Sequence, residues 1–255
     1  MSQQCKTVLD NGMTVISRTM PDVRSVSLGL WFNVGSRDER PDQAGLTHFM
    51  EHMMFKGTPT KGPLDISMHF DRLGAELNAF TSKEYTCYYA RFVDDKLEDA
   101  LSVLAEMVIE SNFSQDAIDT EREVVIEEIA RSEDTPDDYV YELYSQSNLP
   151  NHPCGLPVLG TRDRVGSYRN ADCVDFQAKK ELSADKVNIA RKLILRNIVL
   201  SNRVQLRTDK LHNFLSVGRS CAGINTPLPN TLIASLHRIN RIYKTALFAY
   251  LLKQT

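Results

Sequence analysis

His48-Phe49-Met50-Glu51-His52 spells H-x-x-E-H within residues 44–55, a segment whose apolar spacing predicts a helix. At about 100° per residue, His52 falls roughly 40° from His48 and Glu51 roughly 60° to the other side, so the three side chains share one helix face. The apolar residues gather on the opposite face: Leu46, Phe49, Met50 and Met53. Such a helix can pack its apolar stripe into a core while it turns two imidazoles and a carboxylate outward.

Two histidines at positions i and i+4 can bind one zinc ion through neutral imidazole nitrogens. Glu51 directly precedes the second histidine, so the stretch is the inverted form of the H-E-x-x-H arrangement of zinc hydrolases, in which the glutamate acts as a base. The alternative is that two histidines and a glutamate fall together by chance on an amphipathic helix. A catalytic zinc site needs a third protein ligand, so that ligand decides between the two interpretations.

A second helix is predicted over residues 114–131, where Ser114 can cap its first turn. Glu121 and Glu128 are seven positions apart and fall about 20° from each other on one stripe, whereas Glu127 projects about 100° away from Glu128. Either member of the stripe could complete the three ligands, and helix geometry does not choose between them. The alternative for this Glu-rich helix is an acidic face exposed to solvent.

The remaining segments alternate between strand and helix patterns. Asn11-Gly12 indicates a hairpin turn within residues 6–20, and residues 25–34 alternate apolar and polar side chains as a half-buried strand does. Further elements are predicted as follows: an extended segment at 75–92, helices at 64–73, 94–110, 138–147 and 167–182, and a short strand at 186–190. These patterns permit an α+β fold.

Length and composition indicate an ordinary globular protein. The 255 residues are enough for one large or two small domains, with 42% hydrophobic and 25% charged residues. Five cysteines without a C-x-x-C pair argue against a disulfide framework and favour reduced thiols. Because the sequence begins without a leader pattern and contains no apolar run of about 18 residues, we expect a cytoplasmic protein with no transmembrane segment, with an organelle or the periplasm as open alternatives.

Residues 186–255 differ from the rest of the chain in charge. They carry 12 Lys or Arg residues and one acidic residue, Asp209, and so have a formal charge of +11, while the whole chain stands at -3. Residues 231–252 could form a basic amphipathic helix, so a module for a membrane surface is one alternative function. Nucleic-acid binding is not expected, since neither an aromatic platform nor a known motif accompanies the charge.

The H-x-x-E-H stretch, followed by 75 residues and then Glu128, resembles the H-x-x-E-H-x75-E signature of the inverted-motif zinc peptidases, the family of pitrilysin, insulysin and the mitochondrial processing peptidase. The similarity runs from about residue 6 to residue 190. It also includes Trp31, Gly35-Ser36-Arg37-Asp38-Glu39, Ala44-Gly45-Leu46, Phe55-Lys56-Gly57-Thr58, Leu77-Asn78-Ala79-Phe80-Thr81, Tyr88-Tyr89 and Glu121-Arg122-Glu123. The resemblance implies that residues 1–190 form an α+β domain, with helices packed on one face of a largely antiparallel sheet, as in the N-terminal half of these peptidases.

The resemblance also assigns the residues of the site. It makes His48, His52 and Glu128 the ligands of one zinc ion per chain. Glu51 would be the general base that takes a proton from a zinc-activated water, and Glu121 a carboxylate that orients a ligand by hydrogen bonding. The implied function is that of a zinc-dependent endopeptidase.

Peptide or unfolded polypeptide would be the substrate of such an enzyme. Asn78 and Ala79 lie in an extended segment that could pair with a peptide by adding it to a sheet edge, with ordinary structural pairing as the alternative.

Lys56 stands near the negative end of the histidine-bearing helix, where a cation is favourable.

Members of the family usually contain two similar halves that enclose the substrate, and this chain is long enough for one. We therefore expect a homo- or hetero-oligomer to supply the second half, and an isolated chain that binds zinc but cleaves poorly. Residues 191–255 are unlike the family, and we expect them to form a basic, divergent, poorly ordered tail or an out-of-frame terminus. The competing hypothesis is a non-catalytic zinc-binding scaffold or a subunit of a processing complex.

Overall fold

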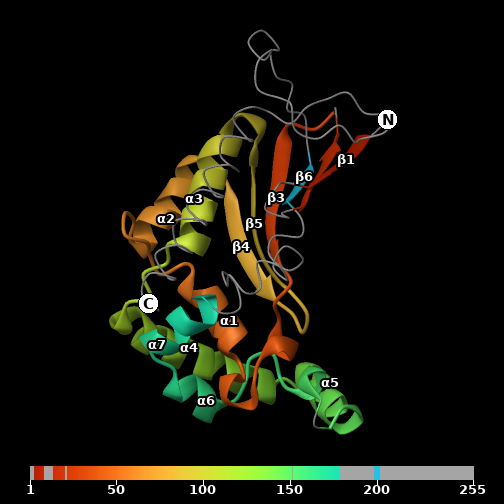
Figure 1. Ribbon diagram of the computed structural model, residues 1–255, viewed down its shortest axis with the longest axis vertical. Helices are drawn as coiled ribbons and strands as arrows, with labels where there is room; N and C mark the ends of the chain where they lie inside the picture. Colours follow the sequence, from red (N-terminus) through yellow and green to blue (C-terminus); the bar gives the residue numbers. More distant parts are fainter. Residues whose placement is uncertain (1–2, 9–13, 21, 151, 179–197, 202–255) are drawn as a thin grey trace, which may run out of the picture.

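A six-stranded sheet runs through the computed structural model, which describes residues 3–8, 14–20, 22–150, 152–178 and 198–201 (Figure 1). Its strands lie in the order β1-β2-β6-β3-β5-β4. Their bounds are Gln3–Val8 (β1), Thr14–Thr19 (β2), Ser25–Phe32 (β3), Glu76–Thr81 (β4), Thr86–Val93 (β5) and Ile198–Ser201 (β6). Only the pair β2 and β6 is parallel among these described neighbours, so the prediction of a largely antiparallel sheet is confirmed.

The expected hairpin and the expected alternating strand are both present. β1 and β2 pair antiparallel, with Val8 opposite Thr14, and the Asn11-Gly12 turn lies outside the described residues. In β3 the alternate residues Val26, Leu28 and Leu30 are buried, as the period of two predicts. β3 pairs along its whole length with β5, which places this apolar face at the centre of the core.

β6 comes from the segment that the sequence assigned to the tail. It lies between β2 and β3, parallel to the first and antiparallel to the second. Residues 179–197 and 202–255, which include the expected strand at 186–190, the expected helix at 231–252 and most of the expected tail, lie outside the described residues. The division of the chain at residue 190 therefore stays a prediction.

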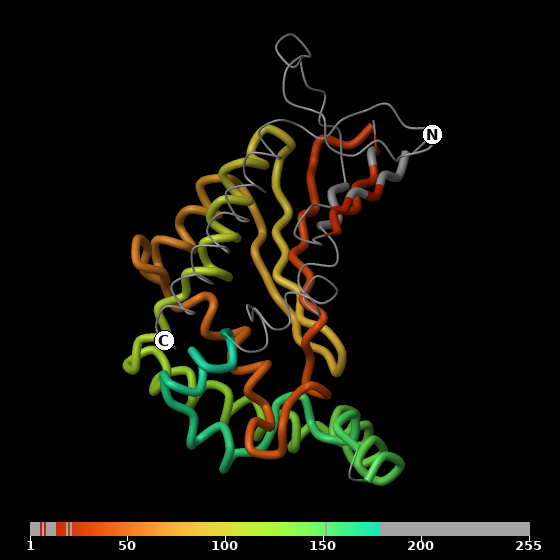
Figure 2. The backbone as a smooth tube through the Cα atoms, viewed as in Figure 1, coloured from red at the N-terminus to blue at the C-terminus, as the bar shows by residue number. Residues whose placement is uncertain are grey.

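Seven α-helices are described: Leu46–Met53 (α1), Pro63–Arg72 (α2), Leu97–Ile109 (α3), Gln115–Asp134 (α4), Pro136–Asn148 (α5), Arg162–Ser167 (α6) and Asn170–Phe176 (α7). Figures 1 and 2 show α2 and α3 running along one side of β4 and β5, while α1, α4, α6 and α7 gather at the lower end of the sheet. None of the described helices is both long and apolar enough to cross a bilayer. The α+β architecture with helices on one face of the sheet is confirmed.

A helix is present within the predicted range of residues 167–182, whose last four residues lie outside the described part of the chain, but the sequence did not predict the short helix α6 before it. α6 ends at Ser167, Tyr168 is extended with ψ 142°, and α7 begins at Asn170. The side-chain hydroxyl of Tyr168 donates to the backbone oxygen of Ala44 at 2.7 Å, and its backbone oxygen accepts from Arg122 at 2.7 Å. These two long-range bonds hold Tyr168 in a conformation that the local helical pattern does not favour.

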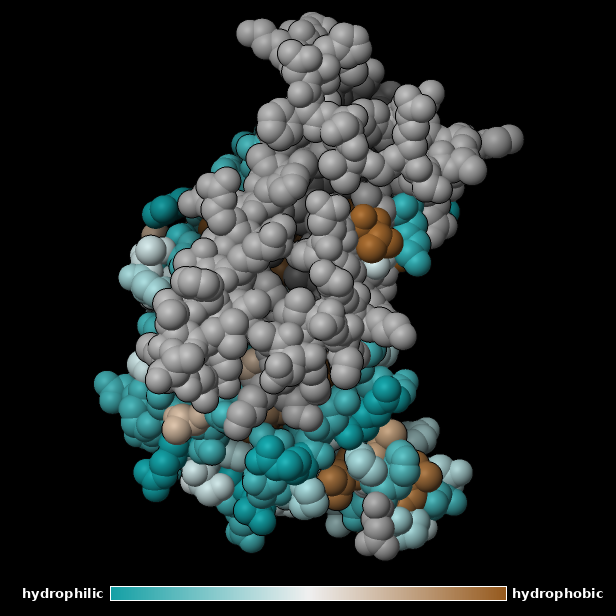
Figure 3. Space-filling model, viewed as in Figure 1, coloured by the Kyte–Doolittle hydropathy of each residue, from teal (hydrophilic) through white to brown (hydrophobic). Residues whose placement is uncertain are grey.

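Helix α5 packs against the molecule through its polar side. Its half-buried residues are Glu142, which lies 3.7 Å from the Nζ of Lys83, and Ser145. Its aromatic and aliphatic residues face outward instead, since Tyr141 is 73% and Tyr144 67% exposed. Figure 3 shows brown and pale side chains over α5 at the lower right of the molecule. An amphipathic helix ordinarily turns the other way.

Candidate metal centre

The start of α1 is fixed by a buried carboxylate. Glu39, 5% exposed, accepts from the backbone N–H of Gly45 at 2.8 Å and from that of Thr47 at 2.7 Å, one bond to each carboxylate oxygen. The first N–H groups of a helix have no partner within the helix, so this side chain supplies one. Burial raises the pKa of Glu39 to about 7, against the opposing effect of the two backbone hydrogen bonds.

Two glycines let the loop before α6 approach that helix start. Gly45 has φ +88°, and a Cβ there would lie 2.5 Å from the backbone oxygen of Leu159. Gly160 has φ +77°, and a Cβ there would lie 2.3 Å from the backbone oxygen of Ala44. Any larger residue at either position would separate the two segments, because the positive φ and the close contact both require glycine.

Helix α1 buries the stripe that the sequence predicts. Leu46, Phe49, Met50 and Met53 are buried. On the other face the side chains of His48 and His52 keep 12% and 18% exposure, and their rings stand 4.7 Å apart between centroids. The helix therefore holds two imidazoles at its partly open face.

Glu128 of α4 approaches both histidines. Its Oε2 lies 3.7 Å from the Nε2 of His48 and 3.4 Å from the Nε2 of His52. Ligands at about 2.0–2.2 Å from a tetrahedral zinc ion stand roughly 3.3–3.6 Å from one another, so these separations fit one ion between the three atoms. Of the two glutamates that the helical stripe left open, the structure brings Glu128 to this position.

The protonation of His48 suits a metal ligand. Burial, helped by the neighbouring His52, lowers the pKa of His48 to about 3, so its ring is neutral at neutral pH. Imidazole binds a metal ion only through an unprotonated nitrogen. The donor set of two imidazole nitrogens and one carboxylate oxygen is that of a catalytic zinc site with a position left for water.

Glu121 lies behind His52 rather than beside the three converging atoms. Its Oε2 stands 3.1 Å from the Nδ1 of His52 and its Oε1 stands 2.6 Å from the Nζ of Lys56. Burial alone would raise the pKa of Glu121, but the hydrogen bonds from His52 and Lys56 bring it below its usual value, so it is a carboxylate. Burial alone would lower the pKa of His52, and the Glu121 hydrogen bond with the Glu128 charge raises it instead.

Glu51 accepts a hydrogen bond from the end of β4. The hydroxyl of Thr81, the last residue of β4, donates to its Oε2. Burial raises the pKa of Glu51, and the Thr81 hydrogen bond opposes the rise. A carboxylate with a raised pKa accepts a proton more readily than one in water does.

Asn78 and Ala79 lie in β4, which ends the described sheet and has a paired neighbour only on its β5 side. Asn78 is exposed, and its Oδ1 accepts from the backbone N–H of Ala79 at 2.8 Å. The same strand contacts α1 and ends at Thr81. β4 therefore runs past the glutamate of the H-x-x-E-H stretch.

The sequence interpretation named Glu39, Lys56 and Thr81 among the family-like positions but gave them no role in this centre, although each had a signal. Lys56 follows His52 by four positions and so shares its face of the helix. Thr81 lies two residues after Ala79 and so shares its side of the strand. Glu39 is an acidic residue just before a helix start, where a carboxylate is favourable.

A family profile described as insulinase, peptidase family M16, matches residues 14–162. An uncharacterized zinc protease of Bacillus subtilis, YmxG, is 44% identical over 180 residues, which is 71% of this chain and 44% of that protein. An uncharacterized zinc protease of Mycobacterium leprae is 41% identical over 176 residues, 69% of this chain and 40% of that one. The chain thus spans less than half the length of these relatives.

Solved structures share the fold. A protease from Helicobacter pylori superposes with a TM-score of 0.66 at 21% identity, covering 80% of this chain and 48% of that one. A peptidase M16 inactive domain from Pseudomonas fluorescens superposes with a TM-score of 0.68 at 19% identity, covering 78% and 46%. At these identities the likeness concerns the fold alone.

Proposed function

The chain belongs to the insulinase family of peptidases, family M16, and from that premise we propose that it is the zinc-binding half of an endopeptidase, in which His48, His52 and Glu128 hold one zinc ion. The observation that carries the proposal is the convergence of three donor atoms from two helices, with the Glu128 oxygen 3.4 and 3.7 Å from the two imidazole nitrogens. The zinc protease names of the relatives agree with it.

Glu51 is the general base of the proposed reaction. A bound zinc ion supplies a charge that polarises the peptide carbonyl and makes a water easier to deprotonate. Glu51 accepts the proton of the attacking water, and the Thr81 hydroxyl, which donates to one oxygen of Glu51, restrains the orientation of its carboxylate. Glu121 acts through His52, because a carboxylate at Nδ1 leaves the Nε2 lone pair for the metal.

The substrate we propose is an extended peptide or an unfolded polypeptide. β4 has an unpaired edge in the described sheet, so a peptide could pair with the backbone of Asn78 and Ala79 as an added strand. Thr81, at the end of the same strand, touches Glu51, so a peptide bound along this edge would pass the base. Backbone pairing of this kind is largely independent of the side-chain sequence.

A second half is needed for full activity in this proposal. The relatives extend over more than twice the aligned length, and a partner chain or a further copy would supply the groups that exclude water and stabilise the transition state. We place the protein in the cytoplasm. One structural relative is described as a periplasmic protease of Escherichia coli.

The test is Glu51→Gln, measured for zinc content and for cleavage of quenched fluorescent peptides, each with and without the remaining half of the Bacillus relative added as a separate chain. We expect one zinc ion per chain in the wild type and in E51Q, weak cleavage by the isolated wild type, stronger cleavage with the second half, and none with E51Q. Glu127→Gln, an exposed glutamate of the same helix as Glu128, is the control and keeps activity.

Two results would overturn the proposal. A wild-type chain without zinc would remove the metal centre. A zinc-loaded chain that cleaves nothing with any partner would leave the non-catalytic scaffold as the function. Vigorous cleavage by the purified monomer would overturn only the need for a second half.

A further inference from the structure

We propose that Lys56 is a positioning residue of the metal centre, which acts through Glu121 to fix the ring of His52. The inference rests on the proposed function, since it concerns the zinc ligand of that same site. It assigns a role to a lysine that the sequence places only at a helix end.

The contacts form a chain from Lys56 to His52. The Nζ of Lys56 lies 2.6 Å from the Oε1 of Glu121, while the Oε2 of Glu121 lies 3.1 Å from the Nδ1 of His52. Each partner thus uses a different oxygen of one carboxylate. A carboxylate anchored at one oxygen cannot rotate freely, so the other oxygen stays directed at the imidazole.

The orientation of the Glu121 carboxylate decides which ring nitrogen of His52 carries the proton and which has a lone pair available for a metal ion. An Nδ1–H that donates to Glu121 leaves the lone pair on Nε2, the atom that lies 3.4 Å from Glu128. His48 has no corresponding support, because its Nδ1 is buried without a hydrogen-bond partner among the described residues. The outer contacts of the centre therefore act mainly on His52.

The ion pair between Lys56 and Glu121 is partly buried, so it is expected to contribute more than an ion pair at the surface does. The side chain of Glu121 is 5% exposed and that of Lys56 29% exposed. Exposed pairs contribute little, whereas removal of one partner from a buried pair leaves an uncompensated charge. Without the lysine, Glu121 would be drawn toward water or other donors, and the His52 ring would lose its fixed orientation.

The backbone brings Lys56 to this place by continuing the helical turn. The N–H of Lys56 donates to the oxygen of Met53 at 3.1 Å, beyond the end of α1. This turn leaves the Nζ of Lys56 in reach of Glu121, on the side of the molecule where Glu121 meets His52. Gly57, with φ +127°, then turns the chain away.

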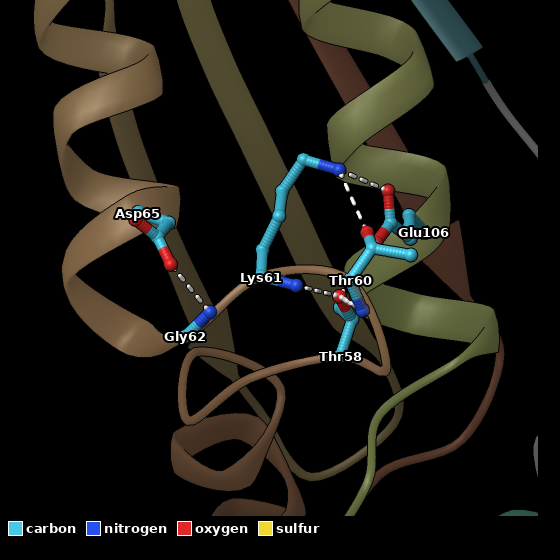
Figure 4. Close-up of polar contacts among 6 residues, drawn as sticks. All are labelled: Thr58, Thr60, Lys61, Gly62, Asp65 and Glu106. Carbon is cyan, nitrogen blue, oxygen red and sulfur yellow. Dashed lines mark hydrogen bonds and ion pairs between the residues drawn. The ribbon is translucent and has the colours of Figure 1, made fainter.

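The loop that follows Lys56 contacts α3 through a separate set of side chains. The Thr58 hydroxyl donates to Glu106 at 2.5 Å, and the Nζ of Lys61 lies 2.6 Å from the same carboxylate, as Figure 4 shows. The backbone oxygen of Gly57 accepts from Asn112 at 3.2 Å. The chain is thus held immediately after Lys56.

Lys61 and Glu106, drawn in Figure 4, form a second lysine–glutamate pair with the same 2.6 Å separation, and Glu106 also accepts from the hydroxyls of Thr58 and Thr60. Lys61 is therefore the matched control for Lys56. The experiment compares K56M, K56R and K61M in the full chain. The zinc dissociation constant is measured by competition with a chromophoric chelator, and the cobalt-loaded proteins give visible absorption spectra that report ligand geometry.

We expect K56M to bind zinc about tenfold more weakly than wild type, near the lower end of what loss of a supporting contact costs a metal site. K56R keeps the charge and is expected to restore most of the affinity. K61M is expected to match the wild type in affinity and in cobalt spectrum, while K56M alters the spectrum. If K56M does not fold, K56Q, a neutral donor, tests the same step and is expected to weaken binding.

The inference is overturned if K56M, or K56Q in its place, binds zinc as the wild type does and gives the same cobalt spectrum. It is also overturned if K56M and K61M weaken binding equally, because the effect would then be general loosening of the fold. A wild type that binds zinc but cleaves no peptide would overturn the proposed function, while the comparison of Lys56 with Lys61 could still be made.

Discussion

Glu39 illustrates how a single buried side chain sets the position of a helix. It satisfies two backbone N–H groups at the start of α1 and has no counter-charge among its two hydrogen-bond donors. The histidines lie one and two turns further along the same helix, so an error at this end would move both of them.

Replacing Glu39 by Gln is expected to lower the free energy of unfolding by about 1–3 kcal/mol, because an amide offers one acceptor oxygen and turns its NH₂ toward a buried backbone donor. Urea denaturation of the zinc-free protein measures the change. Asp42→Asn is the control, since Asp42 pairs with the exposed Arg40, and it is expected to leave the urea midpoint nearly unchanged. An unchanged midpoint for E39Q would contradict the anchoring role.

The stability cost of Glu39→Gln is expected to depend on pH. The pKa of Glu39 is raised from 4.5 to about 7 by burial. A carboxyl with a raised pKa stabilises the folded state below its ordinary pKa, and this contribution is lost as the pH rises through 7. The cost of E39Q is therefore expected to be larger at pH 5 than at pH 8, and the reverse order would contradict the assignment.

Residue roles were partly predictable. The spacing of His48 and His52 fixes their common face, since a helix repeats every 3.6 residues. Glu121 and Glu128 could not be separated in this way, because they differ by only about 20° around the helix but by about 10 Å along it. Which end of α4 crosses α1 is a property of the packed molecule, so only the structure could bring Glu128 to the histidines and Glu121 behind one of them.

At the scale of elements, the contact between α1 and the loop before α6 depends on Gly45 and Gly160. Gly45→Ala is expected to lower the free energy of unfolding by about 2 kcal/mol or more, because alanine is strained at φ +88° and its Cβ would collide with the oxygen of Leu159. Gly166→Ala is the control, since nothing lies within 4 Å of its Cβ position in α6, and a gain of up to about 1 kcal/mol is expected there. Equal effects of the two changes, measured by denaturant unfolding, would contradict the close approach.

Elements with a strong period were predicted well. The strand at β3 and the helices at α2 and α3 lie within a few residues of their predicted bounds, because their apolar spacing reflects one buried face. The short helix α6 was missed, and the contacts that hold Tyr168 extended after it come from Ala44 and Arg122, far away in sequence. The pairing of β6 between β2 and β3 was likewise not predictable from the local pattern.

At the scale of the whole molecule, the candidate centre joins α1 to α4, so zinc should stabilise the fold as well as support catalysis. At a free zinc concentration of 100 times Kd, the folded state is expected to gain about 2.7 kcal/mol over the chelator-treated protein. Thermal unfolding with and without zinc measures the gain. His48→Ala should abolish it, while His152→Asn, at an exposed position away from the centre, should retain it. A gain that persists in H48A would place the ion elsewhere.

Because the large side chains of α5 are exposed, selection for folding and selection for function can be told apart at this helix. Its tyrosines contribute little to folding because water already surrounds them, so drift along that stripe leaves the domain intact. In a saturation screen scored for abundance, α5 would tolerate exchange where α1 and α3 would not. If a screen scored for growth finds that substitutions in α5 are harmful, the cause would have to be a loss of function and not a loss of folding stability.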